Sequence, residues 1–316
     1  MKERWKGNEE KRVAKTKVKK AEFILTKQKT SIIKGAAILF VILSHCGLIE
    51  CGGAIGVDLF LIVSGYGIYY SSKKGTSDFW KKRIISVYFP YLFTTLVFLI
   101  IRITLGFRPT IFEVLISIFG LDFNLNIDPT MWYISYIFVM YVLAYFYIKT
   151  ENRVVRVIGG GLLILLITLC GYKYFIWHRG TIAWAYGLSF PIGFFLGKYK
   201  DLLGNKVKGI GICAFALSIA LLFVEHEAYI KMIFPLVVSL SIIIFIAYRQ
   251  IKFNLLQFIG NNSFFMYLNE WMVISCVSYL INNDVAKCVV SIVVSLFFAL
   301  VLSRLYVYVF KRKIEG

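Results

Sequence analysis

The sequence is poor in the residues that build disulfide-linked or zinc-binding proteins. Its 316 residues include six cysteines and three histidines. The cysteines are scattered and form no C-x-x-C pair, so the sequence indicates neither a disulfide framework nor a metal site. It also lacks an internal repeat of fixed period, and no soluble domain is expected after the last apolar run. These absences argue against small secreted scaffolds and repeat architectures.

Acidic residues are also scarce, with 17 aspartates and glutamates against 36 lysines and arginines and a net charge of +19. Such a charge suits a nucleic-acid-binding protein, but its distribution indicates a membrane protein instead. Of the 36 cations, 28 fall in residues 1–29, in the C-terminal tail and in alternate loops, and only six in the other loops. Because cytoplasmic loops collect lysine and arginine, we expect both termini in the cytoplasm and no nucleic-acid partner.

Apolar residues make up 59% of the chain, and the mean hydropathy is +0.74. This composition predicts an all-α polytopic membrane protein of the plasma membrane, with about ten transmembrane helices. We expect a basic cytoplasmic tail over residues 1–29, disordered or lying on the membrane surface, a single membrane domain over 30–310, and a short cytoplasmic tail over 311–316. The expected spans are 31–49, 55–71, 88–105, 131–148, 157–174, 181–198, 209–225, 230–248, 263–281 and 286–309, with an amphipathic segment at 110–121.

Two ionisable residues interrupt the first expected span. Lys34 and His45 are eleven residues apart, so on a helix they share one face, about 16 Å apart along the axis. Each ionisable group at membrane depth costs roughly 2.5–3.5 kcal/mol. Either Lys34 snorkels to the inner surface and His45 lies at the outer one, or the two residues line one route through the protein. The other histidines, His178 and His226, fall in expected outer loops, where solvated histidines are ordinary.

The second expected span carries Asp58 and Ser64 among glycines, from Gly56 to Tyr66. We expect Asp58 at the depth of His45, where a carboxylate fixes the tautomer of a histidine and raises its basicity. Ser64 lies about 9 Å deeper by helical rise. The glycines are explained equally well by close helix packing.

Further charges lie at an expected boundary and inside the last two spans. Lys82 and Arg83 belong to a basic, aromatic segment that either anchors the chain at the inner surface or binds phosphate. Glu270 and Arg304 lie at membrane depth, where they either pair across the last two helices or line a cavity.

In this order, the motifs resemble those of the acyltransferase-3 family of integral-membrane O-acyltransferases, over nearly all of residues 30–310. Each motif alone is weakly specific, whereas the ordered set is specific. The matching residues are Lys34 and His45, Gly56-Val57-Asp58 with Phe60, Ser64-Gly65-Tyr66, Phe79 to Arg83 with Pro90-Tyr91, Trp132-Tyr133, and Ile259-Gly260-Asn261-Asn262-Ser263 with Tyr267-Leu268.

The chain departs from the family pattern at four places, which bear on the substrate more than on the reaction. Lys34 stands where the family often has arginine, and Ser86 stands where a second arginine is common. After Trp132 the chain lacks a glutamate that is frequent in the family. Asn269-Glu270 stand where a histidine is frequent.

The resemblance implies transfer of an acyl group, usually acetyl from acetyl-CoA, to a hydroxyl of a sugar or polysaccharide on the far side of the membrane. His45 is then the expected catalytic residue, with Asp58 orienting it. Lys34, Lys82 and Arg83 are the expected donor-binding residues. We expect acyl-CoA as donor substrate, no permanently bound cofactor, and the lipid bilayer and a glycan acceptor as partners. The expected cavity residues are Ser64, Tyr66, Trp132, Glu270 and Arg304.

Two other classes of protein stay open at this point. A transporter or flippase for a lipid-linked glycan fits the helices and buried charges, although the internal repeat of many transporters is missing. A catalytically silent scaffold would tolerate removal of the charges at Lys34, His45 and Asp58. The acceptor, a longer donor such as succinyl, an extracytoplasmic partner and a homo-oligomeric state are likewise open.

Overall fold

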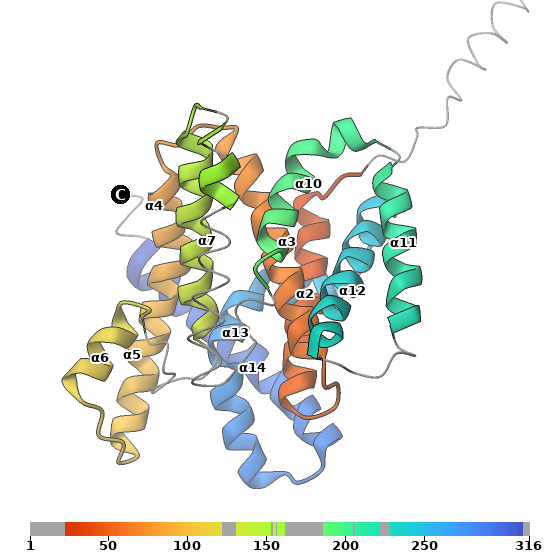
Figure 1. Ribbon diagram of the computed structural model, residues 1–316. Helices are drawn as coiled ribbons and strands as arrows, with labels where there is room; N and C mark the ends of the chain where they lie inside the picture. The colour runs from red at the N-terminus through yellow and green to blue at the C-terminus, as the bar shows by residue number, and fades with distance from the viewer. Residues whose placement is uncertain are drawn as a thin grey trace, which may run out of the picture.

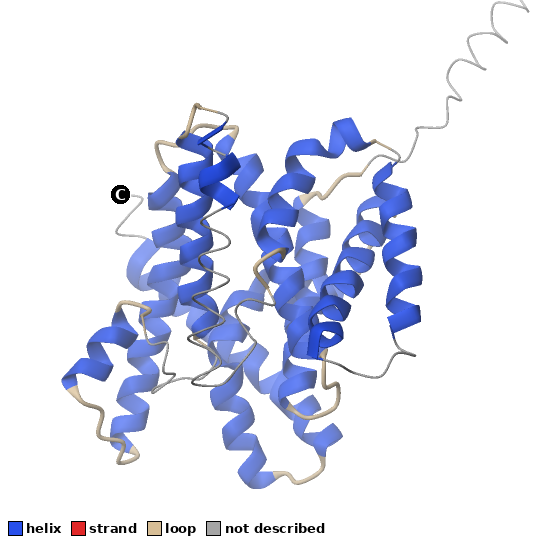
Figure 2. Ribbon diagram, in the orientation of Figure 1, coloured by secondary structure: helices blue, strands red, loops and turns tan. Residues whose placement is uncertain are grey.

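The computed structural model describes residues 23–121, 131–152, 154–155, 157–161, 186–204, 206–221 and 228–311. All regular structure in these ranges is helical, which confirms the all-α prediction for them (Figure 1, Figure 2). The elements are α2 (Lys27–His45), α3 (Gly52–Ser72), α4 (Phe79–Arg83), the π-helical turn η1 (Ile84–Tyr88), α5 (Phe89–Thr104), α6 (Ile111–Ile118), α7 (Trp132–Lys149), α10 (Ser189–Leu203), α11 (Lys206–Leu221), α12 (Ala228–Tyr248), α13 (Asn254–Leu280), α14 (Asp284–Tyr306) and the π-helical turn η2 (Val307–Lys311).

An antiparallel hairpin of α2 and α3 forms the middle of the bundle. A short connection joins the two helices and turns at Gly47, whose φ of +83° favours glycine. α13 packs along α2 and α10 packs along α3, whereas α12 contacts both helices of the hairpin and α14 contacts α2. In Figure 1, α5, α6 and α7 lie on one side of this core, and α11 and α12 on the other.

Glycines let the backbones of α2 and α13 touch. A Cβ built on Gly260 would lie 1.7 Å from the carbonyl oxygen of Ser31, and one on Gly35 would lie 2.1 Å from a carbonyl oxygen of α13. The Ser31 hydroxyl also hydrogen-bonds to Asn261 Oδ1, at 2.8 Å, across the same crossing. Close approach through small residues is how helices pack in membranes, so these glycines fix how α2 lies against α13.

Among the described residues, four helical stretches are long and apolar enough to cross a membrane, whereas the predicted count of ten crossings and the sides of the termini stay predictions. α2 and α13 are not among the four, because their polar residues lower the mean hydropathy. Hydropathy therefore fails to detect the two helices that carry Lys34, His45 and Glu270. The four stretches are Gly52–Ser72, Phe79–Thr104, Trp132–Lys149 and Asp284–Val309, and Ile233–Tyr248 is a shorter apolar helix.

Several predicted boundaries differ from the observed ones. The span predicted at 263–281 belongs to α13, which begins nine residues earlier at Asn254, because hydropathy marks an apolar slab and not the helix that continues beyond it. Phe23 and Leu25 are buried, so the folded part begins before residue 30. The segment predicted at 110–121 contains α6. Most of 1–29, 157–174 and 311–316, and residues 181–185 of the span predicted at 181–198, lie outside the described residues.

Candidate active site

α2 carries both ionisable residues of the first motif. The helix is unbroken from residue 27 to 45, so Lys34 and His45 lie about 16 Å apart along one axis. The Thr26 side chain caps its start by accepting a hydrogen bond from the Lys29 N–H, at 3.2 Å. The ammonium of Lys29 donates to the carbonyl of Ala247 in the last turn of α12. We call the two ends of the bundle the Lys29 end and the His45 end.

His45 is held by a carboxylate from α13. Its Nδ1 lies 3.0 Å from both carboxylate oxygens of Glu270. The Glu270 side chain is fully buried, whereas that of His45 is 29% exposed. The Trp271 ring packs edge-on against the imidazole, with ring centroids 5.4 Å apart. A carboxylate on Nδ1 keeps the proton there and makes Nε2, on the opposite side of the ring, the basic nitrogen. We call this pair the His45–Glu270 dyad.

Asp58 does not make the orienting contact that the sequence suggested. It is buried on α3, where its carboxylate accepts a hydrogen bond from the Ser189 hydroxyl at the start of α10. A Cβ built on Gly52, the first residue of α3, would lie 2.7 Å from the carbonyl of Phe40, so α3 already begins below the level of His45. Asp58 lies six residues further, about 9 Å deeper. The expected equal depth was wrong because apolar patterns do not fix where a turn ends.

A cavity of about 230 Å³ lies beside Lys34, between α2, α3, α7, α13 and η1. Its wall combines the lysine with several hydroxyl groups and with aromatic and aliphatic carbon. Such a wall suits an elongated ligand that carries amide groups and a negative charge. The hydroxyl-bearing residues of the wall are Ser64, Ser86, Tyr133, Tyr141, Ser263 and Tyr267.

Tyr267 connects this cavity with the dyad. It is the residue of the cavity wall that lies nearest to Glu270 along α13, three residues or about 4.5 Å before it. Its ring packs edge-on against the Tyr133 ring of α7, with centroids 5.3 Å apart. The two tyrosines therefore stand on the side of the cavity that faces the dyad.

Arg83 and Lys82 have different surroundings although they are neighbours in sequence. Arg83 is buried, donates to the carbonyl of Phe79 at 2.9 Å and lies 4.1 Å above the Phe79 ring. Its guanidinium is also 5.9 Å from the ring of Tyr141, which lines the cavity. Lys82 is exposed and lies 3.8 Å from Asp78. Neither side chain lines the cavity, but Arg83 lies behind Tyr141 of its wall.

Comparison with known families agrees with this arrangement. A family model described as an acyltransferase domain, Acyl_transf_3, matches residues 31–304. The chain belongs to the acyltransferase-3 family. The matched range contains the dyad and the whole cavity wall, and it identifies the protein as a membrane acyltransferase. No curated protein and no solved structure gives a significant match.

Three other predicted cavity residues of this acyltransferase lie away from the Lys34 cavity. Tyr66 is buried near the Lys29 end against Phe23, with ring centroids 6.2 Å apart. Trp132 stacks on Tyr186 at 5.6 Å. Arg304 is exposed near the end of α14. Glu270 therefore pairs with the histidine of α2 and not with an arginine of α14.

Sequence reasoning about this acyltransferase missed the role of Glu270 and the tyrosines of the cavity wall. An acid in the middle of an apolar helix needs a partner, and that signal was present. His45 was a possible partner, since it also lies at membrane depth on a motif helix. The remaining histidines, His178 and His226, lie outside the described residues.

Proposed function

We propose that this acyltransferase transfers acetyl from acetyl-CoA to a hydroxyl of a cell-surface glycan across the plasma membrane. The His45–Glu270 dyad is the observation that carries the proposal. The cavity beside Lys34, on the same helix, supports a donor site in line with it. The distribution of lysine and arginine supports a cytoplasmic Lys29 end and an extracytoplasmic His45 end.

His45 acts as the general base of the transfer. Glu270 keeps a proton on Nδ1, so Nε2 accepts the proton of the acceptor hydroxyl. The hydroxyl oxygen attacks the thioester carbonyl carbon, the carbon–sulfur bond breaks, and the departing thiolate takes the proton from Nε2. The products are the glycan ester and the free thiol of CoA. A positioned general base contributes a factor of about 10²–10⁴ to such a step.

The Lys34 cavity receives part of the donor. Its hydroxyl groups match the amides of a pantetheine arm, and the charge of Lys34 favours an anionic ligand. Arg83, buried behind Tyr141 of the cavity wall, adds a second cation near the cavity. Tyr133 and Tyr267 then lie between the donor arm and the dyad, where the thioester passes toward Nε2.

The test compares the surface glycans of cells that produce the wild type, the His45→Ala variant or no protein. NMR and mass spectrometry measure the amount of polymer and its acyl esters. We expect normal polymer that lacks esters in the His45→Ala cells, with the variant present in the membrane at wild-type abundance. Cys276→Ala, at an exposed position of α13, is the control and keeps the esters. Near wild-type esterification by His45→Ala overturns the proposal, and loss of polymer without the protein indicates a transporter.

A further inference from the structure

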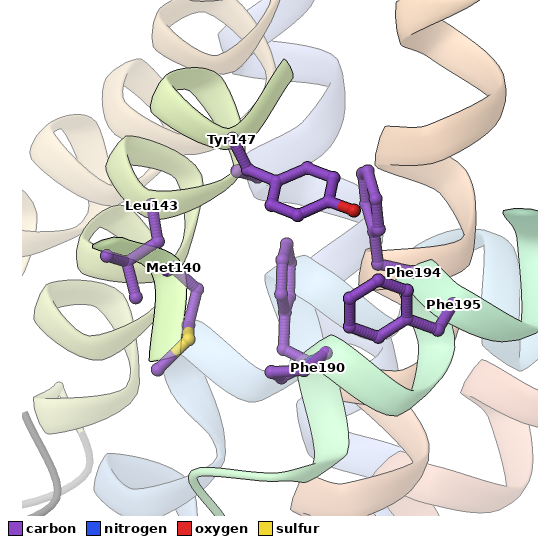
Figure 3. A pocket seen from close by; sticks show the side chains of 9 residues that line it. Met140, Leu143, Tyr147, Phe190, Phe194 and Phe195 are labelled. Carbon is purple, nitrogen blue, oxygen red and sulfur yellow. The ribbon is translucent and has the colours of Figure 1, made fainter. Parts of the chain in front are cut away.

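A second cavity lies between α7 and α10, on the far side of α3 from α2. It has a volume of about 60 Å³ and an apolar wall. Figure 3 shows the rings of Phe190, Phe194 and Tyr147 arranged around it, with Met140 on the α7 side. From Tyr147 to Met140 the wall follows seven residues of α7, about 10 Å. We call this space the α7–α10 pocket.

The central residue of a triple glycine lies in the wall of the pocket. Gly160 lines it, and a Cβ there would lie 3.7 Å from the Tyr147 ring. Cβ atoms on Gly159 and Gly161 would meet nothing within 4 Å. The triple glycine therefore has one position that faces the pocket and two that do not.

One lysine contacts a tyrosine of the pocket wall, and two others lie near tyrosine rings next to the pocket, toward the Lys29 end. Lys198 Nζ donates to the Tyr147 hydroxyl at 2.9 Å. Lys73 and Lys200 lie 5.5 and 5.8 Å from the ring centre of Tyr70. We call these three lysines the lysine rim.

The rim is continuous with the pocket and keeps its positive charge. Phe194 of the pocket wall contacts the Tyr147 ring at 5.4 Å and the Tyr69 ring at 5.5 Å. A hydrogen bond with the Tyr69 hydroxyl raises the pKa of Lys73, so this lysine stays protonated. Asp201, 85% exposed and 3.7 Å from Lys200, offsets one of the three charges.

We propose that the α7–α10 pocket and the lysine rim bind one anionic glycerophospholipid, with part of an acyl chain in the pocket and the phosphate on the rim. An apolar wall takes hydrocarbon, and clustered lysines at the membrane surface attract anionic lipid. A free phosphate satisfies only the rim, whereas a neutral lipid satisfies only the pocket. The proposal rests on the orientation that places the Lys29 end in the cytoplasmic leaflet, and not on acyl transfer.

Native mass spectrometry of the full-length protein in detergent tests this site by counting bound lipid during titration. The probes are phosphatidylglycerol, phosphatidylcholine with the same chains, and glycerol 3-phosphate as the free headgroup. We expect phosphatidylglycerol to bind most tightly and glycerol 3-phosphate not to displace it. Lys198→Gln weakens phosphatidylglycerol by about fivefold, the effect of one lysine near an anionic surface. Gly160→Leu weakens both lipids at least as much.

The controls are Gly161→Leu, beside the pocket-facing glycine, and Lys252→Gln, an exposed lysine of the α12–α13 loop; neither changes lipid binding. A melting curve in the same detergent shows that each variant is folded, and Ala144→Leu fills the pocket from α7 if Gly160→Leu does not fold. Equal binding of the two lipids, displacement by glycerol 3-phosphate or by acetyl-CoA, or wild-type binding by both site variants overturns the proposal.

Discussion

The two ionisable residues of the α2 motif, Lys34 and His45, belong to different kinds of site. At the His45 end, one imidazole lies between a fully buried carboxylate and the ring of a tryptophan, which hold it in one orientation. Deeper along the helix, Lys34 borders a cavity of about 230 Å³ with a hydroxyl-rich wall. A base must be held in one geometry, whereas a site for a long donor must offer space and polar groups. The difference suggests that positioning and donor binding are assigned to separate parts of one helix.

Both parts depend on the same pair of helices. α2 supplies Lys34 and His45, and α13 supplies Glu270 and part of the cavity wall. These helices touch through glycines near the Lys29 end, and more apolar helices surround them. Substitutions at the dyad, at the helix crossing and near the cavity should therefore have effects that differ in kind.

The largest effect is expected at the dyad. Glu270→Gln removes the negative charge that faces His45 Nδ1. It should lower the turnover of acyl transfer by about a hundredfold, a substantial part of what a general base contributes. Asp58→Asn is the matched control, because this carboxylate lies deeper and bonds to Ser189. A turnover assay with both variants checks this. A larger loss for Asp58→Asn than for Glu270→Gln would restore Asp58 as the orienting residue.

The next effect is expected at the helix crossing. Gly260→Ala places a methyl group against the Ser31 carbonyl and should reduce stability by roughly 1–3 kcal/mol, as overpacking does. Gly209→Ala, at an exposed position of α11 with open space around it, should keep or raise the melting temperature. Melting curves in one detergent compare the two variants. An unchanged melting temperature for Gly260→Ala would mean that the crossing is not close-packed.

The smallest effect separates two neighbouring cations. Arg83→Gln removes a buried charge beside Tyr141 and should raise the donor KM about tenfold, the value of a charge-assisted contact. Lys82→Gln removes an exposed charge beside Asp78 and should change it by less than about twofold. Initial rates over a range of acyl-CoA concentrations measure both. Equal shifts would show that the segment acts only through its total charge.

Much of the fold follows from the sequence, because apolar runs predict membrane helices whatever their neighbours are. The spacing of Lys34 and His45 likewise predicts a shared helix face, since one helix fixes both positions. The pairing of His45 with Glu270 could not be predicted in this way, because it depends on the parallel packing of α2 and α13, which begins at Gly35 and Gly260. The depth predicted for Asp58 was wrong for a similar reason, since that depth depends on where the turn after α2 ends.

The most direct test of the division along α2 measures Lys34→Ala and Glu270→Gln in one steady-state assay, with acyl-CoA varied and the acceptor saturating. We expect Lys34→Ala to raise the donor KM by roughly tenfold or more with kcat nearly unchanged, as loss of a charge-assisted contact would. Glu270→Gln should lower kcat and leave the donor KM nearly unchanged. If both variants change the same parameter to a similar extent, Lys34 and the His45–Glu270 dyad do not serve separate roles.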